Sequence, residues 1–266
     1  MRRTAVLYKR VGETPLQAIG AWKAKHPEYA SVVACYAGRL DPMADGKLLV
    51  LFGDECKRQK HYTGLDKEYE IEVLLDLGSD TGDVLGIPDL ANQETRVDPL
   101  ALHGILQKEK GKHLRKYPLF SSKTVNGKPL FLHTLEENTE NIDIPEHIEE
   151  IYAIKLLEAY RLPLLPLRTR IFDLLSLAPR SDEPSKALGA DFRQDEIREK
   201  WGILFSKLTD REFAVLRLRI ACGSGTYMRS LASRIGEALG SKGLALSIRR
   251  TRIGRYAFGL WYTTYI

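Results

Sequence analysis

Cysteine is scarce in this 266-residue sequence, which contains only Cys35, Cys56 and Cys222 and no CxxC pair. This spacing indicates neither a zinc site nor a disulfide framework. A few widely spaced cysteines are typical of a reducing compartment, and we expect a cytoplasmic protein. The six histidines form no HxxxH or HExxH pattern, so common metal-binding motifs are absent as well. We therefore predict that the protein works without a metal.

Long hydrophobic runs are also missing. The apolar stretch nearest the N-terminus, Ala5 to Tyr8, is far too short for a signal peptide. Nothing downstream reaches the length of about 20 residues that a membrane-spanning helix needs. We expect no association with a membrane. At this length the chain can bury a substantial core, as one large domain or two small ones.

Acidic residues are nearly absent from the C-terminal part of the chain. Between Arg211 and Ile266 there are ten Lys or Arg residues against Glu212 and Glu237, so this segment carries +8 whereas the whole chain carries +5. Such a concentration of positive charge indicates a polyanionic partner, with nucleic acid as the first candidate. The alternative is a solvated basic face without a partner.

Strand and helix patterns alternate along the chain. In residues 67–78 the apolar side chains recur at every second position, which predicts a strand with one face on the core. Asn126-Gly127 between two extended segments predicts a tight hairpin. Residues 226–240 have the apolar spacing of a helix that ends at Gly240. This mixture of strands, hairpins and helices predicts an α+β fold with a mainly antiparallel sheet.

A polar turn at residues 36–46 runs directly into an apolar strand. Its sequence, YAGRLDPMADG, places Arg39 and Asp41 between Gly38 and Gly46. A strand holds the end of its loop still while a ligand can reach that loop, which makes Asp41 a candidate nucleophile or base. An arginine nearby would keep its carboxylate ionised. The alternative is a purely structural turn, because Asp-Pro and glycine are common in turns.

A second glycine-rich turn, Gly223 to Thr226, ends one predicted strand and begins the helix that follows. Its backbone amides could form an anion-binding nest. The alternative is an ordinary turn in which Thr226 is the N-cap of the helix. Arg229 lies in the first turn of that helix, where the helix dipole disfavours a cation unless an anion pairs with it. A buried aspartate would supply that anion.

Taken together, five segments resemble the catalytic domain of the TruB-type tRNA pseudouridine synthases. They occur in the order found in that family and cover most of the chain. The segments are YKRVGETPLQAI, GRLDPMADGKLLVLFGDECK, KEYEIEVLLDLGSDTGDVLG, YPLFSSKTVNGKPLF, and CGSGTYMRSLASRIGEALG followed by IRRTRIGRY. The resemblance implies the pseudouridine synthase fold and the conversion of a uridine in the T-arm loop of tRNA, at position 55.

The same resemblance implies roles for individual residues. Asp41 matches the catalytic aspartate, and Arg229 matches its ion-pair partner. Tyr69 matches the tyrosine that packs against the target uracil and takes part in proton removal. Lys9 matches a lysine that supports the active-site loop, and Tyr227 is expected to line the uracil pocket.

The implied reaction requires neither cofactor nor metal, because atoms are conserved and no electrons are exchanged. The uracil is detached from C1′ at N1, turned, and rejoined through C5, which loses its proton. A carboxylate can attack C1′ or C6, or remove a sugar proton, and the sequence does not select among these routes. The nucleotide must leave its stack to reach such a group. Arg250 and Arg252 in the basic C-terminal part are expected to hold phosphates around the pocket.

Four features depart from the family pattern. Tyr36 stands where the family usually has a histidine that helps to displace the loop base, and an aromatic ring there can still stack. Arg39, which we expect to contact the RNA substrate, gives GRLD, where TruB-type enzymes commonly have a small polar residue and the ribosomal pseudouridine synthases have arginine. Residues from about 163 to 208 resemble an insertion between two core strands. The chain ends soon after RIGRY, so we expect a single catalytic domain over residues 1–266 without a PUA domain.

We therefore predict an enzyme that acts on the T-arm of tRNA as a monomer, with no protein partner implied. One alternative is the same reaction on ribosomal RNA. Another is an RNA-binding or tRNA-folding protein that keeps the fold without catalysis. The presence of Asp41, Tyr69 and Arg229 together argues against this last alternative, because binding alone would not require the three residues.

Overall fold

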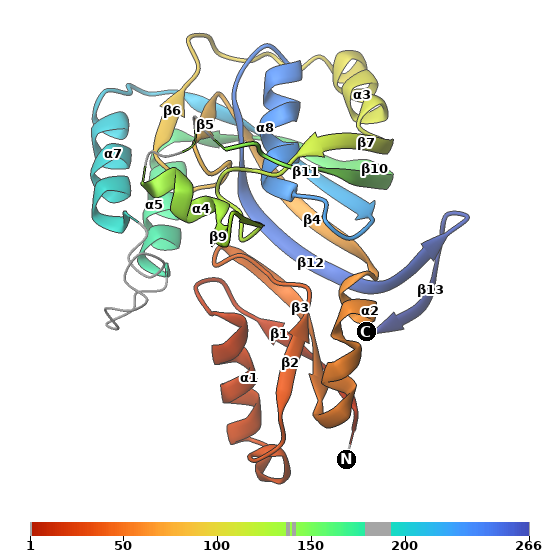
Figure 1. The fold of residues 1–266 in the computed structure, drawn as a ribbon. Coiled ribbons are helices and arrows are strands. Elements are labelled where there is room, and N and C mark those ends of the chain that lie inside the picture. The colour runs from red at the N-terminus through yellow and green to blue at the C-terminus, as the bar shows by residue number, and fades with distance from the viewer. Residues whose placement is uncertain (1, 137–138, 140–141, 179–192, 266) are drawn as a thin grey trace.

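A single large sheet organises the protein (Figure 1). The computed structural model describes residues 2–136, 139, 142–178 and 193–265. Within these residues the sheet has nine strands, in the order β1-β3-β12-β4-β11-β10-β7, with β2 paired to β3 and β13 paired to β12. The strands are β1 (Thr4–Lys9), β2 (Ala34–Ala37), β3 (Ala44–Phe52), β4 (Asp66–Leu75), β7 (Gly111–Lys116), β10 (Glu146–Pro163), β11 (Glu212–Cys222), β12 (Gly243–Ala257) and β13 (Leu260–Tyr265).

All pairings in this sheet are antiparallel except that of β3 with β12, which is parallel. The predicted α+β fold with a mainly antiparallel sheet is therefore confirmed. Two small sheets complete the strands, namely β5 (Leu77–Ser79) with β6 (Pro88–Leu90), and β8 (Thr124–Val125) with β9 (Lys128–Pro129). The β8–β9 pair is the hairpin predicted at Asn126-Gly127, where both residues have positive φ angles.

Helices cover the sheet and fill the loops between its strands. They are α1 (Pro15–Ala24), η1 (Pro27–Tyr29), η2 (Gly53–Arg58), α2 (Gln59–Thr63), α3 (Pro99–Lys108), α4 (Leu130–Leu135), α5 (Leu164–Ser176), α7 (Gln194–Ser206) and α8 (Met228–Ala238). Helix α1 begins as its sequence dictates, because Thr14 and Gln17 form a capping box and Pro15 occupies the first helical position. In the described part of the chain no helix is both long and apolar enough to cross a membrane.

The main core lies between the sheet and helices α5, α7 and α8. Helix α8 packs along β12, α5 packs on β10 and α7, and α7 packs on β6. The indole of Trp201 in α7 is fully buried and donates to the carbonyl of Val84 at 3.1 Å. The segment that resembles an insertion thus supplies two helices to the core, and its residues 179–192 lie outside the described residues.

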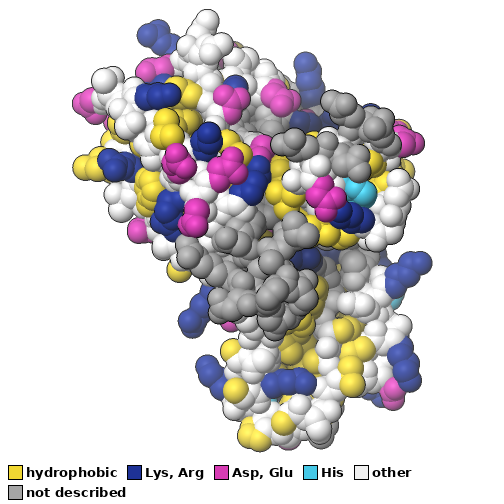
Figure 2. Space-filling view, turned by 60° about the vertical axis from the view of Figure 1, so that its left-hand side comes forward, with side chains coloured by type: hydrophobic (Ala, Val, Ile, Leu, Met, Phe, Trp, Pro, Cys, Tyr) yellow, Lys and Arg dark blue, Asp and Glu magenta, His cyan; other side chains and the backbone are white. Residues whose placement is uncertain are grey.

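A smaller lobe hangs below this body in Figure 1 and contains β1, β2, the later part of β3, α1 and α2. Its core is a separate cluster of apolar side chains that includes Leu7, Ile19 and Phe52. Charged side chains of both signs are mixed over the upper body on the face shown in Figure 2. On the smaller lobe the charged side chains visible on this face are mostly Lys and Arg.

Candidate active site

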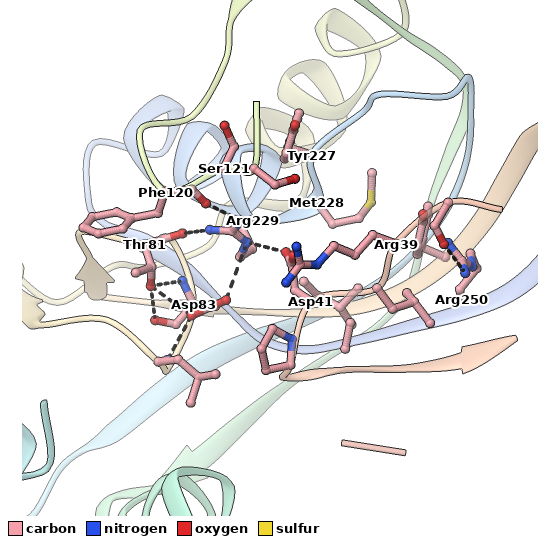
Figure 3. Close-up of a pocket in the computed structure, with 18 of the residues that line it drawn as sticks. Arg39, Asp41, Thr81, Asp83, Phe120, Ser121, Tyr227, Met228, Arg229 and Arg250 are labelled. Carbon is pink, nitrogen blue, oxygen red and sulfur yellow. Dashed lines mark hydrogen bonds and ion pairs between the residues drawn. The ribbon is translucent and has the colours of Figure 1, made fainter. Parts of the chain in front are cut away.

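A cavity of about 410 Å³ opens where β3, β4, β12 and the start of α8 meet (Figure 3). Its wall includes Asp41, Tyr69, Asp83, Tyr227 and Arg229, which come from four separate stretches of the sequence. The volume lies within the range of about 300–1,000 Å³ that is usual for small-molecule sites. The predicted catalytic residues Asp41, Tyr69 and Arg229 are therefore brought together at one cavity.

The loop that carries Asp41 joins β2 to β3 and is shaped by glycine at each end. Gly38 has a φ of +81° and Gly46 a φ of +111°, conformations that favour glycine. Gly46 also lies opposite Arg250 in the parallel β3–β12 pair, where any side chain would collide with the Arg250 backbone. The two glycines thus allow β3 to approach β12 closely while the loop turns Asp41 toward the cavity.

Two buried cations hold the backbone of this loop. Lys9, at the end of β1, is fully buried and donates from Nζ to the carbonyls of Ala44 at 2.6 Å, Arg10 at 3.0 Å and Pro42 at 3.4 Å. Burial lowers the pKa of Lys9 to about 8. Arg250 is 1% exposed and donates to the carbonyls of Lys47 at 2.7 Å and Gly38 at 3.1 Å. Both cations act on the loop that positions Asp41.

The prediction that Arg250 holds a phosphate is wrong in this structure. Its guanidinium is buried and already bound to loop carbonyls. Arg252, two residues further along β12, has a side chain that is 49% exposed and lies 3.4 Å from Glu68. Arg39 is exposed and lines the cavity (Figure 3). Arg39 and Arg252 are therefore the predicted RNA-binding arginines that solvent can reach.

Arg229 connects α8 to three other parts of the site. Its Nε donates to Oδ2 of Asp41 at 2.8 Å, Nη1 to the carbonyl of Thr81 at 2.6 Å, and Nη2 to the carbonyl of Phe120 at 3.0 Å. The Arg229 side chain is only 7% exposed, whereas that of Asp41 is 39% exposed. The arginine is thus fixed in the protein while the carboxylate it orients still faces the cavity (Figure 3).

A second carboxylate shares Arg229. Oδ2 of Asp83 lies 3.6 Å from Arg229 Nε, and its side chain is 6% exposed. Burial raises the pKa of Asp83 to about 6, although Arg229 opposes the rise. For Arg229, burial alone would lower the pKa, but the charges of Asp41 and Asp83 outweigh it and raise the pKa above its ordinary value. Arg229 therefore stays charged at the centre of an Asp41–Arg229–Asp83 group.

Sequence reasoning missed Asp83, because GSDTGDVLG gave only a loop. In the structure Oδ1 of Asp83 accepts hydrogen bonds from the Thr81 hydroxyl and the Leu85 amide, both at 2.9 Å. The sequence offered one signal. Asp83 is a carboxylate in a polar, glycine-containing loop that comes shortly after the strand with Tyr69. Its burial beside Arg229 depends on tertiary packing and was not visible in the sequence.

Two tyrosines line the cavity. Tyr69, on β4, packs against the main core, and burial raises its pKa. Tyr227, the residue before α8, has a pKa raised to about 12, mainly by burial. Its ring makes edge contacts with Tyr117 at 6.2 Å and His147 at 5.7 Å between ring centroids. Both phenols are therefore neutral near pH 7 and present aromatic surface to the cavity.

The Gly223–Thr226 turn is occupied by a carboxylate of the protein itself. The amide of Tyr227 donates to Oε1 of Glu149 at 3.0 Å, and Glu149 is 3% exposed. The alternative in which Thr226 is the N-cap is wrong, since Tyr227 is the N-cap residue and the Thr226 hydroxyl donates to the Gly223 carbonyl. The anion expected at this turn is thus an internal glutamate from β10.

Tyr36, in β2, lies in the small lobe. Its ring packs against the apolar cluster that contains Ile19 and Phe52, and it is not among the described residues that line the cavity. A contact of Tyr36 with RNA outside the cavity stays a prediction. Among the residues that the structure describes, no three His, Cys, Asp or Glu side chains are grouped as metal ligands.

Comparisons with known proteins identify one family. The model of the TruB family pseudouridylate synthase N-terminal domain matches residues 29–171. The tRNA pseudouridine synthase B of Francisella tularensis subsp. novicida is 26% identical over 226 residues, which are 84% of this chain and 56% of that protein. The protein of the same name from Francisella philomiragia gives the same identity and shares. The chain thus spans a little over half the length of these relatives.

A solved structure supports the fold. A chain in the crystal structure of a Cbf5-Nop10-Gar1 complex aligns with a TM-score of 0.53 and 18% identity, covering 94% of this chain and 48% of that one. Because the identity is low, this likeness bears on the fold alone. The family model matches more than half of the residues, from the small lobe into α5. The chain therefore belongs to the TruB family of pseudouridylate synthases.

Proposed function

We propose that this chain converts a uridine to pseudouridine in tRNA, in the T-arm loop at position 55. Membership of the TruB family and the relatives named tRNA pseudouridine synthase B support the reaction and its RNA. The observation that carries the proposal is the Asp41–Arg229 pair, which presents a partly exposed carboxylate to an open cavity. A binding protein would gain nothing from a carboxylate placed where an RNA phosphate would be repelled.

Asp41 is the group that reacts. The bond from C1′ to N1 breaks, N1 and C5 exchange places, C5 bonds to C1′, and the C5 proton is lost while N1 gains one. Asp41 attacks C1′ or C6, or removes a sugar proton, and each route needs an ionised carboxylate. Arg229 favours the ionised form, because its Nε donates to Oδ2 of Asp41 at 2.8 Å. Its hydrogen bonds to the carbonyls of Thr81 and Phe120 fix the orientation of the guanidinium.

Asp83 acts through Arg229 as a positioning residue. At neutral pH its carboxylate competes with Asp41 for the same guanidinium, because Nε lies 3.6 Å from one and 2.8 Å from the other. This sharing lowers the net charge around Arg229 and leaves Asp41 more nucleophilic than it would be in an isolated ion pair. The Asp83 side chain is only 6% exposed, whereas that of Asp41 is 39% exposed, so Asp83 is not assigned a chemical step.

Tyr69 and Tyr227 hold the uracil. A nucleotide that leaves its stack loses base–base contacts, and an aromatic ring can replace them. The raised pKa of Tyr69 keeps its phenol protonated, which favours ring packing over service as a base. The cavity of about 410 Å³ has room for a pyrimidine nucleoside.

All parts of this site come from one chain, so we take the monomer as the active unit. The three cysteines are free, which suits a reducing compartment such as the cytoplasm. We also propose that residues 1–266 form one catalytic domain, with an insertion at about residues 163–208.

Tritium release tests the reaction. Unmodified tRNA transcript labelled with [5-³H]uridine should release one tritium per molecule, and the same transcript with cytidine at position 55 should release none. Ribosomal RNA fragments labelled in the same way serve as the competing substrate. Tritium release from these fragments alone would show that the substrate is rRNA and not tRNA. An absence of release from both RNAs, with binding retained, would refute catalysis and leave an RNA-binding protein.

A further inference from the structure

A two-residue hairpin between β12 and β13 ends in an exposed phenylalanine. Ala257 pairs with Leu260, and the turn consists of Phe258 and Gly259. Phe258 is 97% exposed, and the hairpin projects from the body at the right of Figure 1. A large apolar side chain this exposed, at the tip of a projecting element, is not explained by the core or by the cavity.

The backbone makes phenylalanine a costly choice at this position. Phe258 has a φ of +52° and Gly259 a φ of +79°. A two-residue turn with positive φ at both positions favours Asn-Gly, because Asn tolerates the left-handed region and bulky side chains do not. Strained residues of this kind gather at ligand-binding and functional positions. The positive φ and the exposure of the ring together make Phe258 a candidate contact residue.

The base of the hairpin is rigid. Asp66, which is 6% exposed, accepts from the Tyr152 hydroxyl at 2.9 Å and from the Tyr256 amide at 2.8 Å. The rings of Tyr152 and Tyr256 stack with 5.4 Å between centroids, and Trp261 contacts Tyr256 at 5.2 Å. These contacts among three aromatic rings support the base of the hairpin and hold its tip in a defined orientation.

Charge around the hairpin identifies the kind of partner. From Ala238 to Ile266 the sequence has five Lys or Arg residues and no Asp or Glu. Arg252 and Arg255 on the outer part of β12 are both exposed. Arg252 lies 3.4 Å from Glu68 but keeps half of its side chain exposed. An exposed aromatic ring near exposed cations matches the surfaces that bind unpaired nucleotides, where rings stack on bases and cations meet phosphates.

Strand β12 also fixes the distance between this tip and the cavity. Arg250 lines the cavity, and Phe258 follows eight residues later along the same strand and its turn. At about 3.3 Å per residue, these residues span roughly 25 Å. The tip therefore lies too far away to touch the nucleotide in the cavity, but within reach of another part of the same folded RNA.

From these observations we infer that Phe258 stacks on an unpaired nucleobase of the RNA substrate, roughly 25 Å from the target uridine, with Arg252 and Arg255 at neighbouring phosphates. The inference rests on the proposed function only in taking a structured RNA as the ligand. It assigns a second RNA contact that is separate from the catalytic cavity and contributes to binding rather than to chemistry.

Two substitutions test this contact. Phe258→Asn removes the ring and places a favoured residue in the turn, so the variant should be at least as stable as the wild type in thermal unfolding. Its Kd for an unmodified tRNA transcript should rise about tenfold. Phe258→Trp keeps a stacking surface and should bind within about threefold of the wild type. Leu100→Asn removes another exposed apolar side chain, 83% exposed on α3, and should leave the Kd unchanged.

Turnover separates this inference from the proposed function. With saturating RNA, the single-turnover rate of Phe258→Asn should equal that of the wild type. If the wild type binds tRNA but has no activity, the proposed function fails while the Kd comparison still tests the tip. An unchanged Kd in Phe258→Asn would overturn the inference. The inference would also be overturned if sedimentation showed the wild type as a dimer and Phe258→Asn as a monomer. The ring would then pack on a second copy of the chain.

Discussion

Replacement of Arg229 by lysine tests how much of the site depends on the guanidinium and how much on charge alone. Arg229 contacts Asp41 at 2.8 Å, Thr81 carbonyl at 2.6 Å, Phe120 carbonyl at 3.0 Å and Asp83 at 3.6 Å. Lysine keeps the charge but has no planar fork, so it can retain one carboxylate and loses both carbonyls. Each buried acceptor left without a donor costs about 1–3 kcal/mol.

The expected loss in the free energy of unfolding is therefore about 2–6 kcal/mol. Because the cavity can admit water to the freed carbonyls, we expect the lower part of this range, about 2–3 kcal/mol. Catalysis should suffer more than stability does. Asp41 would lose its fixed partner, and misplacement by about 1 Å can cost about 100-fold in rate.

Urea unfolding followed by circular dichroism measures the first quantity, and single-turnover tritium release at saturating tRNA measures the second. Arg217→Lys is the matched control, because Arg217 forms an exposed pair with Glu158 at 3.1 Å. An exposed pair contributes about 0–1 kcal/mol, so the control should change little in either assay. A stability loss below about 1 kcal/mol for Arg229→Lys, together with a rate near that of wild type, would refute this account of the guanidinium.

Two further predictions concern pH and salt. The pKa of Asp83 is about 6 in the folded protein against an ordinary 3.8, so the stability it contributes is present below pH 4 and lost as pH rises through 6, a change of about 3 kcal/mol. The free energy of unfolding of wild type minus that of Asp83→Asn should fall by about 2–3 kcal/mol between pH 4 and pH 7 in urea titrations, and a flat or rising difference would contradict the burial of an unfavourable charge. Arg252→Gln should reduce the slope of log Kd against log salt for tRNA by about one. Arg250→Gln should leave that slope unchanged and lower stability, because Arg250 binds loop carbonyls, and a flatter slope for this variant would show that it reaches phosphate after all.

Local patterns in the sequence were sufficient for much of the fold. Strand β4 follows from the alternation in residues 67–78, although it ends at Leu75, before Asp76 with its φ of +69°. The β8–β9 hairpin follows from Asn126-Gly127. These features depend on neighbours along the chain, whose geometry a short sequence determines. Asp41 and Arg229 lie 188 residues apart in sequence, and their contact was predicted from the family resemblance instead.

The arginines of β12 show where sequence reasoning stops. Arg250 and Arg252 are two residues apart, so a regular strand would place them on one face. The pairing of β12 with β4 has a register shift between them, and one side chain is buried while the other is exposed. Bulges of this kind depend on how strands meet in the sheet, and nothing in IRRTRIGRY indicates one.

Buried carboxylates were missed for a similar reason. Asp83 and Glu149 both lie in polar stretches of sequence, which normally face solvent. Each is buried beside distant groups that pair with an anion: Arg229 in the case of Asp83, and the Tyr227 amide together with the Arg234 guanidinium in the case of Glu149. Such a pairing appears only after the chain has folded.

Asp41→Asn is the most direct test of the central claim that the Asp41 carboxylate performs the reaction. The variant keeps the size and hydrogen-bonding capacity of the side chain, so Kd for unmodified tRNA should stay within about threefold of wild type. Asp54→Asn, in an exposed pair with Lys57, is the control. Single-turnover tritium release from [5-³H]uridine tRNA should be abolished in Asp41→Asn and unchanged in the control. Tritium release by Asp41→Asn at the wild-type rate would contradict the account.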